Sequence, residues 1–436
     1  MKVVADLEVH SKYARAVSSQ MVIPTIAAWA DKKGIDLVGT GDFTHPMWLR
    51  ELTSLLEEAG EGVYKFRDSN FKTRFLLSTE ISCIYTHLGR GRRIHILVYL
   101  PTFADVTKFN QNLTSMGANL FSDGRPIVGL TLSQIVETAL AVNSKALVIP
   151  AHVWTPWFGF YGANGGYDSL SEAFGESEKF IPAIETGLSS DPAMNWRIGE
   201  LTGKRIVSFS DAHSPAKLGR EATVFDMPEI SFEGVRKAVW GEEGANISYT
   251  IEFYPEEGKY HYTGHRNCKV VYSPNDARKL GTVCPVCGKN LTVGVMSRVE
   301  ELGRQEPETE SETDKFGVRW IKHKEGTKPP YIMMVPLLEI LAEAVESGVS
   351  SQKVVNVYEQ LVGTFGSEFG VLLATSVGEI EKLVGVRVAE GISKVRSGDI
   401  VIEPGYDGVF GKVKIWPSYA KGSEDKKDTI DQGTLF

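Results

Sequence analysis

Over its first 250 residues the chain alternates short apolar runs with helix-like segments, and this alternation restricts the fold more than any other feature. Continuous apolar runs indicate buried strands, and strands that alternate with helices favour a parallel sheet or barrel covered by helices. We therefore predict an α/β fold over residues 1–250. The expected strands are 3–7, 37–40, 75–81, 94–100, 146–151, 181–186 and 206–210, and the expected helices include 24–33, 46–59, 131–141 and 192–201.

Nearly every predicted strand carries a side chain at one end that can bind a metal ion. Since ligands of α/β folds bind where strands end and loops begin, we expect these side chains to converge. The candidate metal ligands are Asp6, Glu8, His10, Asp42, Glu80, His95, His152, Glu185, Asp211 and His213. Carboxylates with imidazoles are typical ligands of zinc, manganese and related ions, and these outnumber the needs of one ion. The sequence predicts a centre of two or three divalent ions (Zn, Mn or Mg), with His10, Glu80 and Asp211 as the catalytic residues. The alternative is that each residue separately caps a helix or pairs within the core.

Three local motifs connect this set to a known family. The pattern Asp6-x-Glu8-x-His10, the segment Gly39-Thr40-Gly41-Asp42 and the final Asp211-x-His213 resemble the PHP (polymerase and histidinol phosphatase) family. The resemblance implies a distorted (β/α)7 PHP barrel with its metals at the carboxyl ends of the strands. Glu8 stands where the family usually has His. A carboxylate still binds hard or borderline metals, so a working and a weakened site both stay open. Asp42 also replaces a His of many PHP proteins, and His45 is not expected to be a ligand.

Residues 253–305 differ in composition from the rest and predict a small zinc-ribbon domain. Three of the four cysteines of the chain lie there, which favours a metal site over a disulfide framework. Four ligands in two pairs, His265 with Cys268 and Cys284 with Cys287, match a tetrahedral structural zinc site. His261 is an alternative to His265. Because so short a segment has little core, we expect the metal to supply its stability.

The C-terminal part reads as a mainly helical domain over residues 315–418, after an acidic linker at 306–314. Residues 383–392 resemble a helix-hairpin-helix, whose backbone N–H groups bind phosphate, although an ordinary helical hairpin is equally compatible. A β-like segment spans 400–415. The tail, 419–436, is charged and predicted to be disordered. Its end, with Gln432, Leu435 and Phe436, resembles a shortened sliding-clamp-binding peptide.

The order of these parts resembles the endonuclease Q family over essentially the whole chain. The resemblance rests on the PHP motifs, on His265-Arg-Asn-Cys and Cys284-Pro-Val-Cys-Gly, and on 397–400 with 404–408. It implies a DNA repair endonuclease that nicks 5′ of deaminated bases (uracil, hypoxanthine) and of abasic sites by metal-activated water, leaving 3′-hydroxyl and 5′-phosphate ends. Damaged DNA and a DNA sliding clamp would be its partners.

Two sequence features fit such a substrate. The aromatic loop after His152 could stack an extruded base, with the pocket residues Trp154, Trp157, Phe158, Tyr161 and Asn195. The alternative is a local core beneath a lid. Arg90, Arg92 and Arg93 could reach DNA phosphates, or they could form a solvated hairpin tip.

Two other functions remain compatible with the sequence. One is a small-molecule phosphatase of the PHP family, although about 185 further residues would then be superfluous. The other is a DNA-binding scaffold whose metal centre does not react, and Glu8 is the residue that keeps this open. A net charge of −8 argues against non-specific binding of nucleic acid by the whole surface. The early acidic residue Asp6 is unlike a signal peptide and no membrane span is expected, so we predict a cytoplasmic protein.

Overall fold

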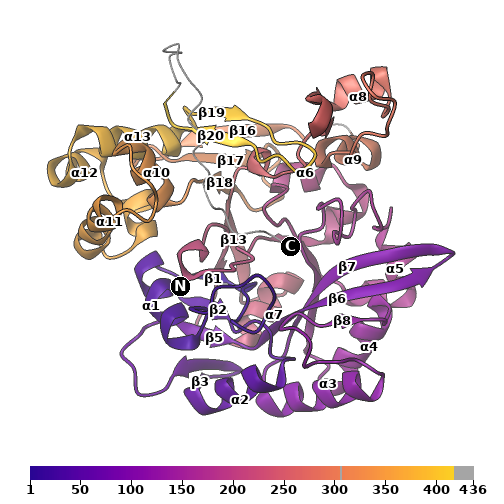
Figure 1. Cartoon of the computed structure of the whole chain (residues 1–436). Coiled ribbons are helices and arrows are strands. Elements are labelled where there is room, and N and C mark those ends of the chain that lie inside the picture. Colours follow the sequence, from indigo (N-terminus) through magenta and orange to yellow (C-terminus); the bar gives the residue numbers. More distant parts are fainter. Residues whose placement is uncertain (305–306, 417–436) are drawn as a thin grey trace.

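The computed structural model describes residues 1–304 and 307–416, and its largest unit is a ten-stranded mixed sheet (Figure 1). The strand order is β16-β17-β18-β13-β12-β1-β2-β5-β4-β3. The strands are β1 Lys2–Asp6, β2 Leu37–Gly39, β3 Leu56–Gly60, β4 Val63–Phe66, β5 Arg74–Leu76, β12 Ala222–Asp226, β13 Asn246–Glu252, β16 Thr309–Thr313, β17 Arg319–His323 and β18 Tyr331–Met333. The mixed α/β class predicted from the sequence is confirmed.

The remaining strands form smaller sheets. A four-stranded sheet has the order β8-β6-β7-β9, and a parallel pair joins β10 to β11. Their bounds are β6 Ser78–His87, β7 Arg90–Tyr99, β8 Ile127–Val128, β9 Leu147–Pro150, β10 Ala183–Glu185 and β11 Arg205–Val207. Two further pairs are β14 Thr263–His265 with β15 Val270–Tyr272, and β19 Val401–Glu403 with β20 Lys412–Lys414.

The pairing is less parallel than predicted. Strands β1, β2 and β5 are parallel neighbours, but β12 pairs antiparallel with β1, and β6 with β7. The predicted strand 75–81 is in fact divided, because β5 belongs to the large sheet and β6 to the four-stranded one. Consequently Glu80 lies inside β6, not at a strand end, and His95 lies in the middle of β7. Since the strands form separate sheets, closure into a seven-stranded barrel stays a prediction.

The helices cover these sheets. They are α1 Ile23–Lys33, α2 Pro46–Leu55, α3 Phe103–Ser115, α4 Leu132–Val142, α5 Leu170–Phe174, α6 Pro192–Trp196, α7 Phe232–Trp240, α8 Pro274–Leu280, α9 Val295–Leu302, α10 Leu337–Ala344, α11 Gln352–Phe365, α12 Val377–Val384 and α13 Val386–Ser397. The 3-10 turns are η1 Gly175–Phe180, η2 Gly199–Gly203, η3 Pro215–Lys217, η4 Pro255–Glu257 and η5 Arg266–Cys268, and η6 Gly370–Ala374 is a π-helix. Helix α1 has Pro24 in its first turn and ends at Gly34, whose φ of 84° is left-handed, as the sequence indicates. None of the helices in 1–304 and 307–416 is long and apolar enough to cross a membrane.

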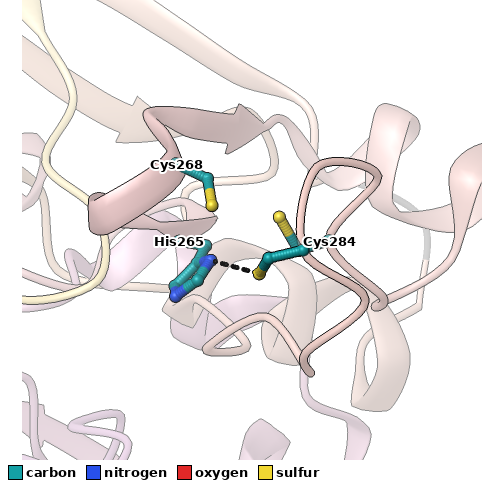
Figure 2. A group of neighbouring side chains, drawn as sticks. His265, Cys268 and Cys284 are labelled. Carbon is teal, nitrogen blue, oxygen red and sulfur yellow. Dashed lines mark hydrogen bonds between the residues drawn. The ribbon is translucent and has the colours of Figure 1, made fainter.

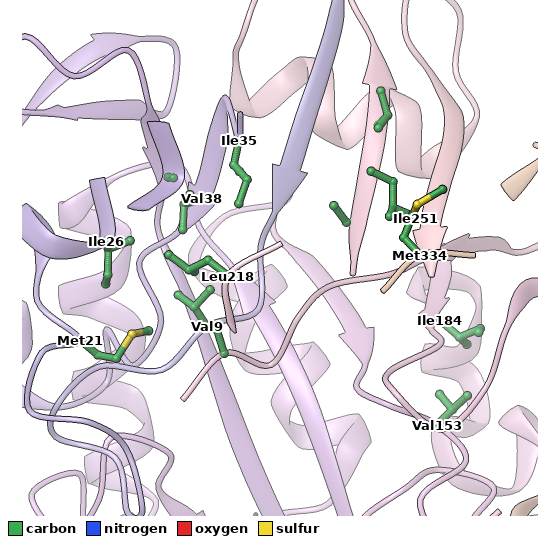
Figure 3. Packing of buried hydrophobic residues seen from close by; sticks show 14 of the residues in the cluster. Val9, Met21, Ile26, Ile35, Val38, Val153, Ile184, Leu218, Ile251 and Met334 are labelled. Atoms are coloured by element: carbon green, nitrogen blue, oxygen red, sulfur yellow. The ribbon is translucent and has the colours of Figure 1, made fainter. Parts of the chain in front are cut away.

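A continuous apolar core lies beside the predicted ligands. Figure 3 shows Ile26 of α1 and Val38 of β2 packed near Val9, which follows β1, with Ile184 of β10 and Ile251 of β13 in the same cluster. All five side chains are buried. The loops that carry the candidate ligands therefore start from closely packed strand ends.

Residues 307–333 do not form the linker that the acidic composition suggested. Strand β16 pairs with β17, β17 with β18, and β18 runs parallel to β13, so this segment extends the large sheet. The exposed Glu and Thr side chains of β16 made an edge strand look like a linker. The helices α10 to α13 follow as predicted, and Gly385, with a φ of 92°, separates α12 from α13. The predicted domain boundaries stay predictions.

Candidate metal centre and nucleic-acid interface

The candidate ligands come from seven strands that belong to three of the sheets. Glu8 and His10 follow β1, and Asp42 follows β2. Glu80 of β6 and His95 of β7 lie diagonally across the hairpin with their side chains in contact, and His152 follows β9. Glu185 ends β10, and Asp211 with His213 follows β11. The structure therefore gathers the predicted residues although their strands do not form one sheet.

Three overlapping groups of side chains could each hold a metal ion. They are His10, Asp211 and His213, then Glu80, His95 and His152, and then Glu8, Glu80 and Asp211. Within each group the ligand atoms lie within 4.8 Å of one another. Glu80 Oε1 is 2.5 Å from His95 Nδ1 and 3.1 Å from His152 Nε2, and its Oε2 is 3.0 Å from His10 Nε2. Glu80 and Asp211 each belong to two groups, which is the arrangement that carboxylates bridging neighbouring ions need.

Several polar atoms of the centre are buried without a hydrogen-bond partner in the described chain. They are both carboxylate oxygens of Glu8 and Oε1 of Glu185. An unpaired buried polar atom costs about 1–3 kcal/mol, and more when it is charged. Bound cations would satisfy all of these atoms. The residues present fit divalent ions, and Glu8 takes part in that fit.

Asp6 and Asp42 belong to none of the three groups, and their oxygens bind protein donors. Asp6 accepts hydrogen bonds from the Ser210 backbone N–H (2.9 Å) and from Gly219 N–H (2.8 Å). Asp42 accepts from Ser11 N–H (2.6 Å), and its Oδ1 lies 2.9 Å from His10 Nδ1. Asp6 thus fixes the backbone beside Asp211, and Asp42 orients the His10 ring, as outer carboxylates do for metal-bound histidines.

The protonation states follow from burial and from this crowding. Burial raises the pKa of Glu8 well above its usual value, with help from Glu185, and burial raises the pKa of Glu185 to about 7. Burial alone would lower the pKa of His10, but Asp42, Asp211 and Glu80 outweigh it and raise that pKa well above 6.5. The centre holds more carboxylate groups than positively charged groups, and this negative charge favours the binding of cations.

Arg125 is a member of this centre that the sequence did not indicate. Its guanidinium donates a hydrogen bond of 2.9 Å to Glu80 Oε2. Against the effect of burial, this arginine and His95 hold the pKa of Glu80 well below its usual range. Arg125 follows no strand end and matches no motif, so only the fold reveals it.

The backbone is strained at three candidate ligands or their supports. Asp42, His152 and Asp211 have φ values of 49°, 28° and 47°, in the region that favours glycine. Such conformations cost about 1–3 kcal/mol each and concentrate at functional sites. Gly41, which precedes Asp42 in the Gly39-Thr40-Gly41-Asp42 motif, cannot be replaced by a larger residue without a clash. A Cβ at this position would lie 2.1 Å from the Val9 carbonyl oxygen.

The predicted zinc ligands converge in a second group. The ligand atoms of His265, Cys268, Cys284 and Cys287 lie within 4.8 Å of one another, with 3.4 Å between Cys287 Sγ and His265 Nδ1 (Figure 2). His261 is outside this group, so the geometry favours His265 over His261 as the fourth ligand of a metal ion. His265 ends β14, and the other three ligands lie in the turns around it.

The aromatic loop is only partly the open pocket that the sequence suggested. Trp154 and Tyr161 are fully buried and stack on each other at 4.9 Å, and Trp154 Nε1 donates to the buried Asn195 at 2.7 Å. For these three residues the prediction of an exposed stacking surface is wrong, because their side chains are buried and pack on one another within the loop. Trp157 and Phe158 stay half-exposed, and the Phe158 ring lies 4.7 Å from that of His95.

The three arginines of the β6–β7 hairpin have different surroundings. Arg90 and Arg93 are exposed. Arg92 is buried, with its guanidinium 3.8 Å from the Tyr167 ring and 2.6 Å from Glu172, and this contradicts a free phosphate contact for it. The hairpin borders a cleft of about 390 Å³ whose other walls come from residues 162–168 and 293–301.

The C-terminal helices match a family model, and two curated proteins are similar to the chain. Residues 336–399 match the model described as the MJ0043 C-terminal domain. The uncharacterized protein YqxK of Bacillus subtilis is 30% identical over 431 residues, which are 95% of this chain and 99% of YqxK. The uncharacterized protein MJ0043 of Methanocaldococcus jannaschii is 32% identical over 61% of this chain but only 31% of its own length.

Two solved structures match nearly the whole chain. One is the lesion-specific endonuclease PfuEndoQ from Pyrococcus furiosus, with a TM-score of 0.80, 33% identity and 95% coverage of both chains. The other is endonuclease Q in complex with a 27-mer duplex substrate that has an abasic lesion at the active site, with a TM-score of 0.81 and 33% identity over 95% of this chain and 96% of that one. The chain belongs to the endonuclease Q family of metal-dependent hydrolases.

Proposed function

We propose that this protein is a DNA repair endonuclease that nicks the phosphodiester 5′ of deaminated bases (uracil, hypoxanthine) and of abasic sites, leaving 3′-hydroxyl and 5′-phosphate ends. The observation that carries the proposal is the cluster of Glu8, His10, Glu80, His95, His152, Asp211 and His213, with Glu185 hydrogen-bonded to the His152 backbone, in a chain that matches endonuclease Q over 95% of its length. We further propose two or three divalent ions there, a PHP-type barrel around them, and one structural zinc at His265, Cys268, Cys284 and Cys287.

The residues of the centre divide the work. Divalent ions held by these ligands would supply a water nucleophile of lowered pKa and an electrophile for the leaving 3′ oxygen. Asp42 keeps Nδ1 of His10 occupied, so that Nε2 faces the centre. Arg125 keeps Glu80 ionised and adds positive charge where a phosphate enters. His10, Glu80 and Asp211 remain the residues proposed to act most directly, since His10 Nε2 lies 3.0 Å from Glu80 Oε2 and 3.1 Å from Asp211 Oδ1.

The substrate path is proposed from the surfaces around the centre. Phe158, whose ring lies beside His95, and the half-exposed Trp157 next to it in the sequence would contact the damaged nucleotide. Arg90, which lines the neighbouring cleft, and the exposed Arg93 would contact DNA phosphates. The buried Trp154, Tyr161 and Asn195 would instead support this surface from behind.

The test uses end-labelled duplexes with uracil, hypoxanthine, an abasic site or no lesion, in Mn²⁺ or Mg²⁺. We expect a nick immediately 5′ of each lesion, none in the undamaged duplex, and none after chelation. Asp211→Ala should abolish nicking, while Asp226→Ala, an exposed aspartate paired with Lys2, should not. No nick from the wild type, recovered by Glu8→His, would mean a weakened metal centre. No nick from either protein would contradict the proposal and favour a small-molecule phosphatase.

The sliding-clamp partner is a separate proposal. Gln432, Leu435 and Phe436, which carry the motif, lie outside the described residues 1–304 and 307–416. Deleting 432–436 should remove stimulation of nicking by a sliding clamp and leave clamp-free nicking unchanged. A clamp effect that survives the deletion would contradict this proposal.

A further inference from the structure

A loop at residues 119–126 lies along the rim of the metal centre and is held tightly. Asp123 Oδ1 accepts hydrogen bonds of 3.1 Å from the backbone N–H groups of Arg15 and Arg125. Gly124 N–H donates to the Tyr13 carbonyl oxygen at 2.9 Å, and Leu120 is buried. The loop ends at Arg125, which binds Glu80. Its position relative to the centre is therefore fixed by the protein itself.

At its outer edge this loop presents an exposed aromatic ring, Phe121, with 68% of its surface exposed. The ring is backed by a row of aromatic side chains that leads into the core. Phe121 meets His45 edge-on at 6.2 Å, His45 stacks on Tyr13 at 4.5 Å, and Tyr13 lies 6.3 Å from the buried Trp48. The Phe121 ring is thus supported by the protein on one side, and its other side is free to contact a bound molecule.

The metal centre opens toward this loop. Its least buried side chains are Asp211 at 18%, Arg125 at 16% and His213 at 14%, while His10 and Glu80 are nearly inaccessible. Arg125 is thus on the more exposed side of the centre, four residues from Phe121 in a loop that the hydrogen bonds of Asp123 and Gly124 hold in place. A DNA strand bound at this side would lie next to the loop that carries Phe121.

From this geometry, and resting on the proposed function, we infer that Phe121 is a wedge that inserts into the duplex where the damaged nucleotide has been extruded. Removing a nucleotide from the stack costs a few kcal/mol, and an aromatic ring in the gap restores part of the lost stacking. Phe158 would lie on the nucleotide, and Phe121 would hold the helix that the nucleotide left. The side chains of His45, Tyr13 and Trp48 behind the ring would keep Phe121 in place while the neighbouring base pairs tend to restack.

The experiment compares Phe121→Ala and Phe121→Leu with the wild type. The substrates are a uracil duplex and the same strand in a mismatched bubble whose bases are already unstacked. We expect Phe121→Ala to nick the duplex about tenfold more slowly and the bubble at the wild-type rate, because stacking on an aromatic ring is lost only where the helix must be opened. Phe121→Leu should retain more activity than Phe121→Ala. Phe180→Ala, another exposed phenylalanine, is the matched control and should nick both substrates normally.

A second readout follows the helix itself. With 2-aminopurine opposite the uracil, binding of the wild type should raise the fluorescence, and Phe121→Ala should lose most of that rise. Equal effects of Phe121→Ala on duplex and bubble, or no effect on either, would overturn the wedge and leave the proposed function intact. Absence of nicking by the wild type would overturn both.

Discussion

Lys33 and Glu368 form a buried ion pair that joins α1 to the C-terminal helices, and its loss has a large expected cost. Lys33 Nζ lies 2.7 Å from Glu368 Oε2, and the side chains are 1% and 4% exposed. The same carboxylate accepts hydrogen bonds from Leu337 N–H at 3.0 Å and from the Tyr358 hydroxyl at 2.9 Å. Glu368→Ala therefore leaves a buried ammonium and two buried donors unpaired.

The cost can be worked from these contacts. Removing one partner of a buried pair costs about 3–5 kcal/mol, and the two further donors add to it without full additivity. We expect Glu368→Ala to lower the free energy of opening of α10 and α11 by about 4–6 kcal/mol, and Lys33→Met by about 3 kcal/mol. The double variant Lys33→Met with Glu368→Gln buries no charge and keeps an acceptor, so it should recover to within about 2 kcal/mol of the wild type.

Hydrogen exchange of the amides in 337–365 measures this opening directly, since a chain of this size need not unfold in one step. The exposed pair of Lys32 with Glu359 is the control, and Glu359→Ala should change exchange by less than about 1 kcal/mol. A cost below about 1 kcal/mol for Glu368→Ala, or a double variant no more stable than Glu368→Ala, would refute the reasoning.

Three further predictions concern other parts of the molecule. Asp42→Asn should lower the pKa of His10 and slow single-turnover nicking about 10–100-fold with metal saturating, because the charge that orients the ring is gone; an unchanged rate would contradict that role. Cys287→Ser should release one metal ion per chain and speed hydrogen exchange in 259–300, as metal analysis would record, whereas Cys83→Ser should keep the full metal content. Burial raises the pKa of Glu252 to about 8, so the folded state keeps a proton that the unfolded state releases above about 4.5, and stability falls as pH rises through this range. Glu252→Gln should flatten that decline by on the order of a few kcal/mol, and equal melting profiles of the two proteins between pH 5 and 9 would speak against it.

The sequence was most informative where chemistry and strand ends coincide. The convergence of His152 and Asp211 could be predicted because each follows an apolar run, and the loops after neighbouring buried strands lie at the same edge. The paired spacing of His265, Cys268, Cys284 and Cys287 was enough to predict that these four side chains come together. In both cases a short stretch of sequence identifies the residues, and the fold then brings these stretches together.

The sequence was least informative where tertiary contacts decide. Arg125 reaches Glu80 from a loop without a motif. The aromatic loop reads equally well as a surface or as a core, and only the packing of Trp154 against Tyr161 separates the two. The polar and acidic residues 309–313 form β16 because β17 pairs with them. The composition of this segment alone does not indicate a strand.

The pairing of β18 with β13 also has a consequence for synthesis of the chain. Residue 250 lies beside residue 331, so roughly eighty residues must leave the ribosome before this sheet edge is covered. Until then β13 presents an open strand edge, to which another unfinished chain could add. A fragment that stops before β18 should accordingly aggregate, and the candidate metal centre would lie on a fully paired β13 only after residue 333 has been synthesised.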